Sequence, residues 1–256
     1  MTAVGVASVT FVCTFGGALL GMAIRNALPP AHVSKESQDA IRLGMGLVAT
    51  MTALLLGLVT AAAKGSFDSQ DRAVKDASAN IVLLDRLLAR YGPETQPTRG
   101  LIHRSLATRI EATWPPGGAE REAFDASQAR SAPSAAEEVE NQILRLAPTT
   151  DAQRWFKSEA LGLTQNVLRA RWGLSTSAGG SVPRTFLAVV IFWLAMTFAS
   201  FGFGAPRNGT VVTVFLVSTF SVAAAVFLVL ELDGAFDGIV RVSSDPLRRA
   251  LANLGQ

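Results

Sequence analysis

The chain has 256 residues, of which 49% are hydrophobic and 17% charged, with a net charge of +3 and a pI of about 9.5. Soluble domains carry about 25% charged residues, so this composition excludes an ordinary soluble protein. The charges are also unevenly distributed, because four windows contain no Asp, Glu, Lys or Arg. These windows are Thr2–Ile24, Leu43–Ala63, Thr185–Pro206 and Asn208–Leu230.

Each uncharged window is 21 to 23 residues long. As a helix that rises about 1.5 Å per residue, each would extend roughly 30 to 35 Å, which matches the hydrocarbon core of a bilayer. We therefore predict four transmembrane helices rather than buried helices of a soluble core. No Lys or Arg precedes the first window, and it is longer than a usual signal-peptide core, so we expect a retained helix.

The orientation follows from the basic residues near the ends of the predicted spans. Four spans place both termini and the segment between the second and third spans on one side of the membrane. Nine basic residues lie near the span ends on that side, and four lie on the other side. We therefore predict that the side with nine is cytoplasmic. The predicted parts are 1–63 with the first two spans and a short periplasmic loop, 64–184 as a helical cytoplasmic insertion, 185–232 with the last two spans, and 233–256 as a cytoplasmic tail.

The second span is predicted to continue beyond the membrane as the same helix. After its apolar window, apolar side chains recur at spacings of three, four and seven residues and form a seam for packing against another helix. The seam consists of Phe67, Val74, Ala77, Ile81, Leu84, Leu88 and Tyr91. With Ser34 as its N-cap and only Gly65 as a weak interior position, this helix is expected to cover residues 34–91, and Gly92 and Pro93 end it.

The rest of the insertion is expected to form shorter helices, because no stretch alternates between apolar and polar residues as a strand does. Capping-box patterns begin two of these helices, and consecutive prolines end another. The predicted helices are Arg99–Trp114, Ser134–Leu146 and Thr150–Trp172, and the predicted connections are a loop at 119–133 and a linker at Ser175–Pro183.

No pattern in the chain predicts catalysis. A phosphate-binding glycine loop, a nucleophile elbow and paired carboxylates on a helix face are all missing, and the single Cys13 has no disulfide partner. We expect no enzyme activity, no cofactor and no metal. The insertion holds 16 basic and 14 acidic residues, which predicts no basic patch for nucleic acid. Glu231, Asp233 and Asp237 could hold a cation, but we expect a solvated or salt-bridged helix end.

Small residues in two spans predict close helix packing. In the first span, Gly17 and Gly21 lie four residues apart. The second span has a stripe of small side chains, which comprises Gly46, Thr50, Ala53, Gly57 and Ala61. Because no ionisable residue lies in the middle of a span, the sequence argues against a proton-coupled transporter, whereas a passive hydrophobic constriction remains open.

Three stretches, Val33–Thr50, Asn80–Glu94 and Leu230–Leu247, resemble the bacterial bestrophin-like membrane proteins, which implies the bacterial inner membrane. More distantly, the chain is similar to the bestrophins, pentameric ion channels with four membrane helices, cytoplasmic termini and a long second helix that lines the pore. Leu56-Gly57-Leu58 is similar to the Leu-Gly-Phe pattern of that pore helix. The resemblance implies a constriction at Thr50, Leu54 and Leu58, although these leucines could also be ordinary buried or lipid-facing side chains.

Two departures from the bestrophins bear on function. Ala235 stands where a Pro is expected after the fourth span, and the acidic run of the calcium clasp is absent, so calcium gating is not implied. We hypothesise a homo-oligomeric, by resemblance pentameric, channel that passes small ions passively across the lipid bilayer. The alternative is a non-conducting membrane scaffold or sensor whose cytoplasmic helices bind a partner. A seam that faces neighbouring copies favours the channel, whereas a seam that faces the chain's own helices leaves both hypotheses open.

Overall fold

The structure is a computed structural model that describes residues 2–27, 35–115, 135–177, 183–236 and 238–255. Every regular element in these residues is a helix, which confirms the predicted all-α fold. Four of the helices are long and apolar enough to cross a membrane, namely Ala3–Arg25, Asp39–Tyr91, Thr185–Gly204 and Gly209–Asp233. The chain is therefore an all-α membrane protein with four candidate spanning helices.

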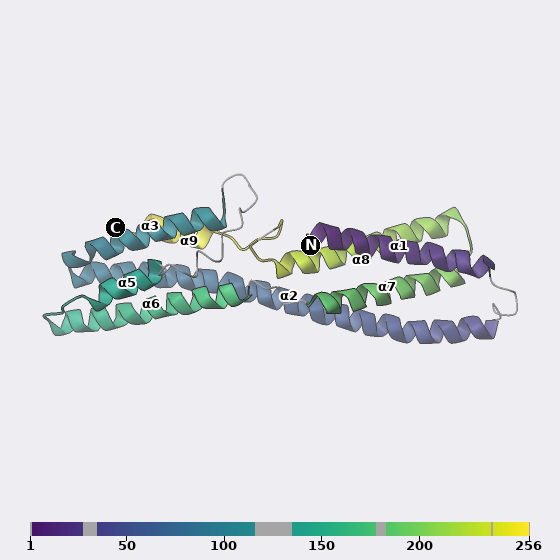
Figure 1. Cartoon of the computed structure of the whole chain (residues 1–256), viewed down its shortest axis with the longest axis horizontal. Helices are drawn as coiled ribbons and strands as arrows, with labels where there is room; N and C mark the ends of the chain where they lie inside the picture. The colour runs from purple at the N-terminus through teal and green to yellow at the C-terminus, as the bar shows by residue number, and fades with distance from the viewer. Residues whose placement is uncertain (1, 28–34, 116–134, 178–182, 237, 256) are drawn as a thin grey trace. The chain divides into compact units, whose positions relative to one another are not determined.

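The elements are shown in Figure 1, which labels the α-helices. They are α1 (Ala3–Ala27), α2 (Lys35–Tyr91), the 3-10 turn η2 (Pro93–Thr95), α3 (Gln96–Thr113), α5 (Ala135–Leu144), α6 (Asp151–Ser177), α7 (Arg184–Gly204), α8 (Gly209–Asp233) and α9 (Asp245–Asn253). They form two compact units. Unit 1 comprises Met1–Phe67 and Gly180–Arg241, and unit 2 comprises Asp68–Gly179 and Val242–Gln256, so α2 takes part in both.

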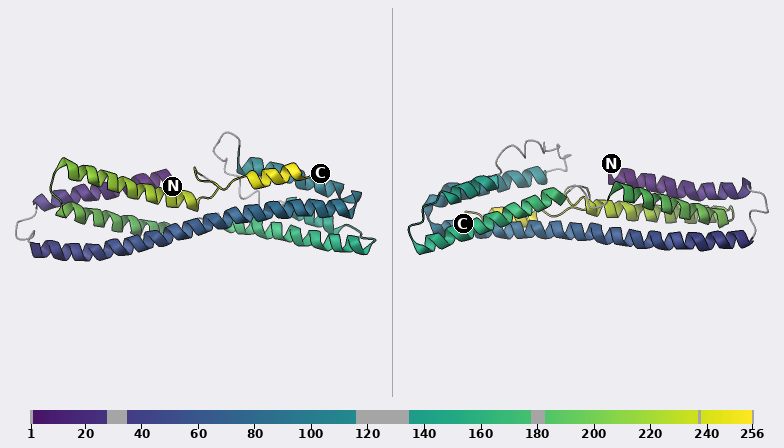
Figure 2. Two further views of the ribbon diagram at one scale, coloured as in Figure 1. Left: turned by 180° about the vertical axis from the view of Figure 1, so that it is seen from behind. Right: turned by 60° about the horizontal axis from the view of Figure 1, so that its bottom comes forward.

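In unit 1, α1 packs against α7 and α8 (Figure 2). Two glycines of α1 face the α7 backbone, since a Cβ at Gly17 would lie 2.7 Å from the Ala195 carbonyl oxygen and a Cβ at Gly21 would overlap that of Ala199. On α7, Gly202 faces the α1 backbone in the same way. Because lipid is as apolar as the side chains, helices in a membrane associate through such close van der Waals packing.

Buried threonines of unit 1 bond their hydroxyls within their own helices. Thr14 donates to the Thr10 carbonyl at 2.7 Å, and Thr219 donates to the Phe215 carbonyl at 2.8 Å. Both donors have no exposed surface. A hydroxyl without an acceptor is costly in an apolar environment, so this bond to the preceding helical turn lets a polar residue lie inside the bundle.

Helix α2 is uninterrupted over its 57 residues, which confirms the long helix predicted from the sequence. The predicted N-cap Ser34 lies outside the described residues. At the other end, Gly92 has a φ of 149°, which falls in the region that favours glycine. The Thr95 hydroxyl then donates to the Leu88 carbonyl at 2.6 Å, which satisfies one of the last carbonyls of α2.

The shorter helices of unit 2 occur close to their predicted positions. At the α6 N-terminus, one bond of the predicted capping box forms, in which the Gln153 N–H donates to the Thr150 hydroxyl at 3.1 Å. The Gln153 side chain accepts from the Thr149 N–H at 2.9 Å, one residue earlier than a capping box requires. Helix α6 continues to Ser177, so part of the predicted linker is helical. The predicted loop at 119–133 lies outside the described residues.

Side chains in unit 2 bond across different elements. Two of these bonds hold the C-terminal segment, since Trp114 Nε1 donates to the Val242 carbonyl at 2.9 Å and the Ser78 hydroxyl donates to the Pro246 carbonyl at 2.8 Å. Lys157 of α6 donates to the Leu144 carbonyl at the end of α5, at 2.8 Å. The C-terminal segment is therefore an integral part of unit 2.

Candidate functional site

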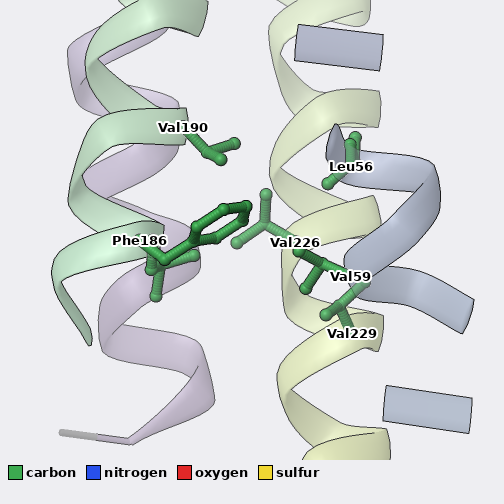
Figure 3. A pocket seen from close by; sticks show the side chains of 7 residues that line it. Leu56, Val59, Phe186, Val190, Val226 and Val229 are labelled. Atoms are coloured by element: carbon green, nitrogen blue, oxygen red, sulfur yellow. The ribbon is translucent and has the colours of Figure 1, made fainter. Parts of the chain in front are cut away.

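Within unit 1, α2 presents two different faces. The side of α2 that carries Thr52, Leu56, Val59 and Ala63 is called the inward face. Thr52 is 3% exposed and Ala63 is fully buried. Leu56 and Val59 line a small apolar hollow shown in Figure 3, together with Phe186, Leu187 and Val190 of α7 and Val226 and Val229 of α8. The inward face therefore packs α2 against its own chain.

The outward face of α2 comprises Leu43, Leu47, Thr50, Leu54 and Leu58. At about 100° of rotation per residue, it lies on the opposite side of the helix from the inward face. Its leucines are 64% to 78% exposed, although they are large and apolar. In a membrane such a surface is covered by lipid or by another protein chain. The three residues predicted to form a constriction thus share one face, and their role as pore-lining residues remains a prediction.

The outward face is uncharged. The Thr50 hydroxyl donates to the Gly46 carbonyl at 2.9 Å, so its proton is used within the helix and its oxygen remains available as an acceptor. Leu54 and Leu58 follow at successive four-residue steps, about one helical turn each. Such a surface cannot attract an ion by charge, but a ring of leucines can close a path by excluding water.

The four glycines predicted to pack helices have different surroundings. Gly17 and Gly21 face the α7 backbone, as described above. Gly46 and Gly57 of α2 have no neighbouring atom within 4 Å of the position that a Cβ would occupy. They lie beside the outward face, so the predicted packing role of Gly46 and Gly57 would require a helix from another copy.

The seam predicted along α2 in unit 2 packs against this chain's own helices. Val74, Leu84, Leu88 and Tyr91 are each less than 5% exposed within the single chain. Hydrogen bonds from Arg99 of α3 to Asp85 and from Gln153 of α6 to the Tyr91 carbonyl join these helices to the same part of α2. The seam therefore does not discriminate between a channel and a scaffold.

Sequence reasoning missed a buried ion pair between α2 and α3. Asp85 is 2% exposed and accepts from Arg99 Nε at 2.7 Å and from Arg99 Nη2 at 2.9 Å. The Gly255 N–H also donates to Asp85, at 3.3 Å. Hydrogen bonding to Asp85 raises the pKa of the Arg99 guanidinium, which stays a cation. The carboxylate directly after the seam residue Leu84 was a signal that Asp85 needs a cationic partner, but the local sequence does not identify Arg99.

The acidic residues after the fourth span differ from the expected solvated helix end. Glu231 is 7% exposed, and its Oε2 accepts from the Ile239 N–H at 2.6 Å and the Val240 N–H at 3.3 Å. The expectation is therefore wrong for Glu231, whose carboxylate holds the following loop. Asp237 lies outside the described residues. No group of three or more His, Cys, Asp or Glu that could hold a metal occurs in the described part of the chain.

Four long apolar helices, of which the second extends far beyond a membrane thickness, define a helical integral membrane protein. The family model of the Bestrophin-like domain matches residues 12–247, nearly the whole chain. The chain belongs to the bestrophin-like family. No curated protein and no solved structure matches it.

Proposed function

We propose that this protein is a homo-oligomeric channel that passes small ions passively, and that the outward face of α2 lines the pathway. The observation that carries the proposal is the separation of the two faces of α2. One face packs against α7 and α8, while the other exposes Leu54 and Leu58 to 71% and 64%. Membership of the bestrophin-like family adds support, since bestrophins are ion channels.

A single α2 cannot enclose a path, so the proposal requires several copies around one axis. Gly46 and Gly57 beside the outward face support this arrangement, because the absence of a side chain lets neighbouring helices approach closely. The resemblance to bestrophins favours five copies. Symmetric copies would bring Thr50, Leu54 and Leu58 together as three successive rings, of which the two leucine rings form an apolar constriction.

The proposed setting is the bacterial inner membrane, with both termini and unit 2 in the cytoplasm. Nine basic residues near the span ends lie on the side of the termini and four lie on the opposite side, which supports this orientation.

The first test is electrical recording from the purified full-length chain in planar lipid bilayers. We expect passive currents, and we expect Leu58→Ala to increase the single-channel current several-fold, because a shorter side chain widens and wets the constriction. Leu216→Ala on α8 is the matched control, since Leu216 is an exposed leucine on another span. A protein that is monomeric in detergent, or that conducts at no voltage or membrane tension, would refute the channel.

The rival function is a membrane scaffold or sensor, and one observation favours it. Trp155 of α6 is 58% exposed and Leu144 of α5 is 53% exposed on unit 2, and large exposed apolar side chains often contact a partner. Trp155→Ala separates the two functions. A channel conducts in the wild type and keeps its current in this variant, whereas a scaffold shows no current in either form and loses partner binding in the variant.

A further inference from the structure

Three arginines gather around the turn between α7 and α8 in unit 1. Arg25 at the end of α1 donates from Nη1 to the Ala205 carbonyl at 2.8 Å. Arg42 of α2 lies close to Gly204, the residue before Ala205, since its Nη2 is 3.9 Å from the position that a Cβ would occupy at Gly204. Arg207 in the turn itself completes the group. We call these three residues the arginine cluster.

The positive charge of the arginine cluster has little compensation. Arg207 donates from Nη2 to the Met22 carbonyl at 3.1 Å, so Arg207 and Arg25 both bond to neutral backbone oxygens. Arg42 has an ion pair with Asp39, but its atoms are 3.9 Å apart and both side chains are about 70% exposed. Exposed pairs with such geometry contribute little. Among the described residues, the cluster therefore has donors and charge available for an anion.

A hollow of about 340 Å³ lies beside Arg207, the member of the arginine cluster that lines it. Arg207, Asn208 and Gly209 line one part of it, and Leu19, Met22 and Val212 of α1 and α8 line another. Its volume falls within the range of small-molecule sites, which is roughly 300 to 1,000 Å³. The combination of one cationic wall and one apolar wall fits a ligand that has an anionic head and an apolar tail.

We propose that the hollow binds an anionic phospholipid, with the phosphate on the arginine cluster and an acyl chain along Leu19 and Val212. The position supports this ligand, because the turn joins two predicted spans and therefore lies at the level where lipid phosphates lie. Arginine suits the role, since its planar fork of donors matches phosphate oxygens. The apolar wall favours a lipid over a free anion. The proposal does not depend on ion conduction or on the orientation in the membrane.

The test measures lipid binding to the detergent-solubilised full-length protein by native mass spectrometry and by thermal melting. The probes are phosphatidylglycerol, phosphatidylcholine and inorganic phosphate. We expect retained phosphatidylglycerol and a higher melting temperature with that lipid alone. Each arginine near a lipid surface contributes about fivefold in affinity, so Arg42→Gln and Arg207→Gln should each weaken phosphatidylglycerol binding by about that factor.

Two controls keep the proposal falsifiable. Arg154→Gln removes an exposed arginine from unit 2 and should leave lipid binding unchanged. Arg42→Gln breaks only a long, exposed ion pair, so it should fold even if Arg207→Gln does not. Equal binding of phosphatidylglycerol and phosphatidylcholine, equal stabilisation by inorganic phosphate, or unchanged phosphatidylglycerol binding to Arg42→Gln would each overturn the proposal.

Discussion

Unit 1 and unit 2 share helix α2 but, away from the arginines at the α7–α8 turn, use different contacts to hold their helices together. In unit 1, backbone atoms approach each other at Gly17, Gly21 and Gly202, and buried threonines bond to their own helices. In unit 2, side chains bond across elements, as between Asp85 and Arg99. A hydroxyl in lipid must find its acceptor nearby, whereas an ion pair can be buried when its two charges are hydrogen-bonded to each other.

This comparison teaches how one helix can pack in two different ways. In unit 1, α2 leaves a leucine-rich face uncovered, a surface that an ordinary soluble domain would avoid. In unit 2 the same helix buries Leu84 and Leu88 under its own chain. The surface where copies of the chain could meet is therefore in unit 1 rather than along the seam in unit 2.

Asp85→Ala tests whether side-chain bonds between elements stabilise unit 2, and it should cause the largest loss of stability. The variant leaves the Arg99 cation, whose side chain is 18% exposed, without its partner, so the free energy of unfolding should fall by about 3 to 4 kcal/mol, the lower part of the range for buried pairs. Chemical unfolding in detergent gives the loss, and hydrogen exchange should show faster opening of unit 2. Asp71→Ala is the control, because its pair with Lys75 is more exposed, at 27% for Asp71 and 59% for Lys75, and should contribute about 1 kcal/mol or less. Equal losses for the two variants would contradict that stabilisation.

Gly21→Ala tests whether close backbone contact holds the helices of unit 1, and a smaller loss of stability is expected. The added Cβ overlaps the Ala199 carbonyl oxygen and must push α1 away from α7, which should cost about 3 kcal/mol. Gly16→Ala on the same helix adds the same methyl group into open space and should be neutral or slightly stabilising. Hydrogen exchange should rise in α1 and α7 only for the Gly21 variant. A neutral Gly21→Ala would show that backbone contact does not hold unit 1.

Tyr91→Phe tests a buried polar group of unit 2 that has no hydrogen bond among the described residues, and it should cause the smallest change in stability. The Tyr91 hydroxyl is buried and has no hydrogen-bond partner among the described residues. Removing a buried, unsatisfied hydroxyl while keeping the ring should stabilise unit 2 by about 1 kcal/mol. Thr95→Val is the contrasting variant, because the Thr95 hydroxyl proton is shared between the Leu88 and Gly92 carbonyls and its loss should destabilise. A destabilised Tyr91→Phe would mean that the hydroxyl has a partner after all.

Much of the fold follows from sequence periodicity. The uncharged windows predicted the four spanning helices, and a seam without proline predicted that α2 runs on to Tyr91. These features are local, since each depends on residues within one helix. Contacts between distant residues are different. Nothing local shows that Asp85 meets Arg99 and Gly255, or that Glu231 turns back to hold the backbone at Ile239.

The candidate site was predictable in part. Helical spacing alone places Thr50, Leu54 and Leu58 on one face. Whether the chain's own helices cover that face depends on how α7 and α8 pack against α2. In the structure, α7 and α8 lie against the inward face, at Leu56 and Val59. What covers the outward face depends on an assembly of several chains, which the pattern of one chain does not specify.

The most direct test of the central claim is cysteine accessibility along α2 during current recording. The chain has a single cysteine, so Cys13→Ser provides a cysteine-free background. In that background, a charged thiol reagent should reduce the current through Leu54→Cys and Leu58→Cys. It should not affect Val59→Cys on the inward face or Val217→Cys, which replaces an exposed valine of α8. Unchanged currents at positions 54 and 58, or an equal reduction at position 217, would contradict the assignment of the outward face of α2 as the lining of the pathway.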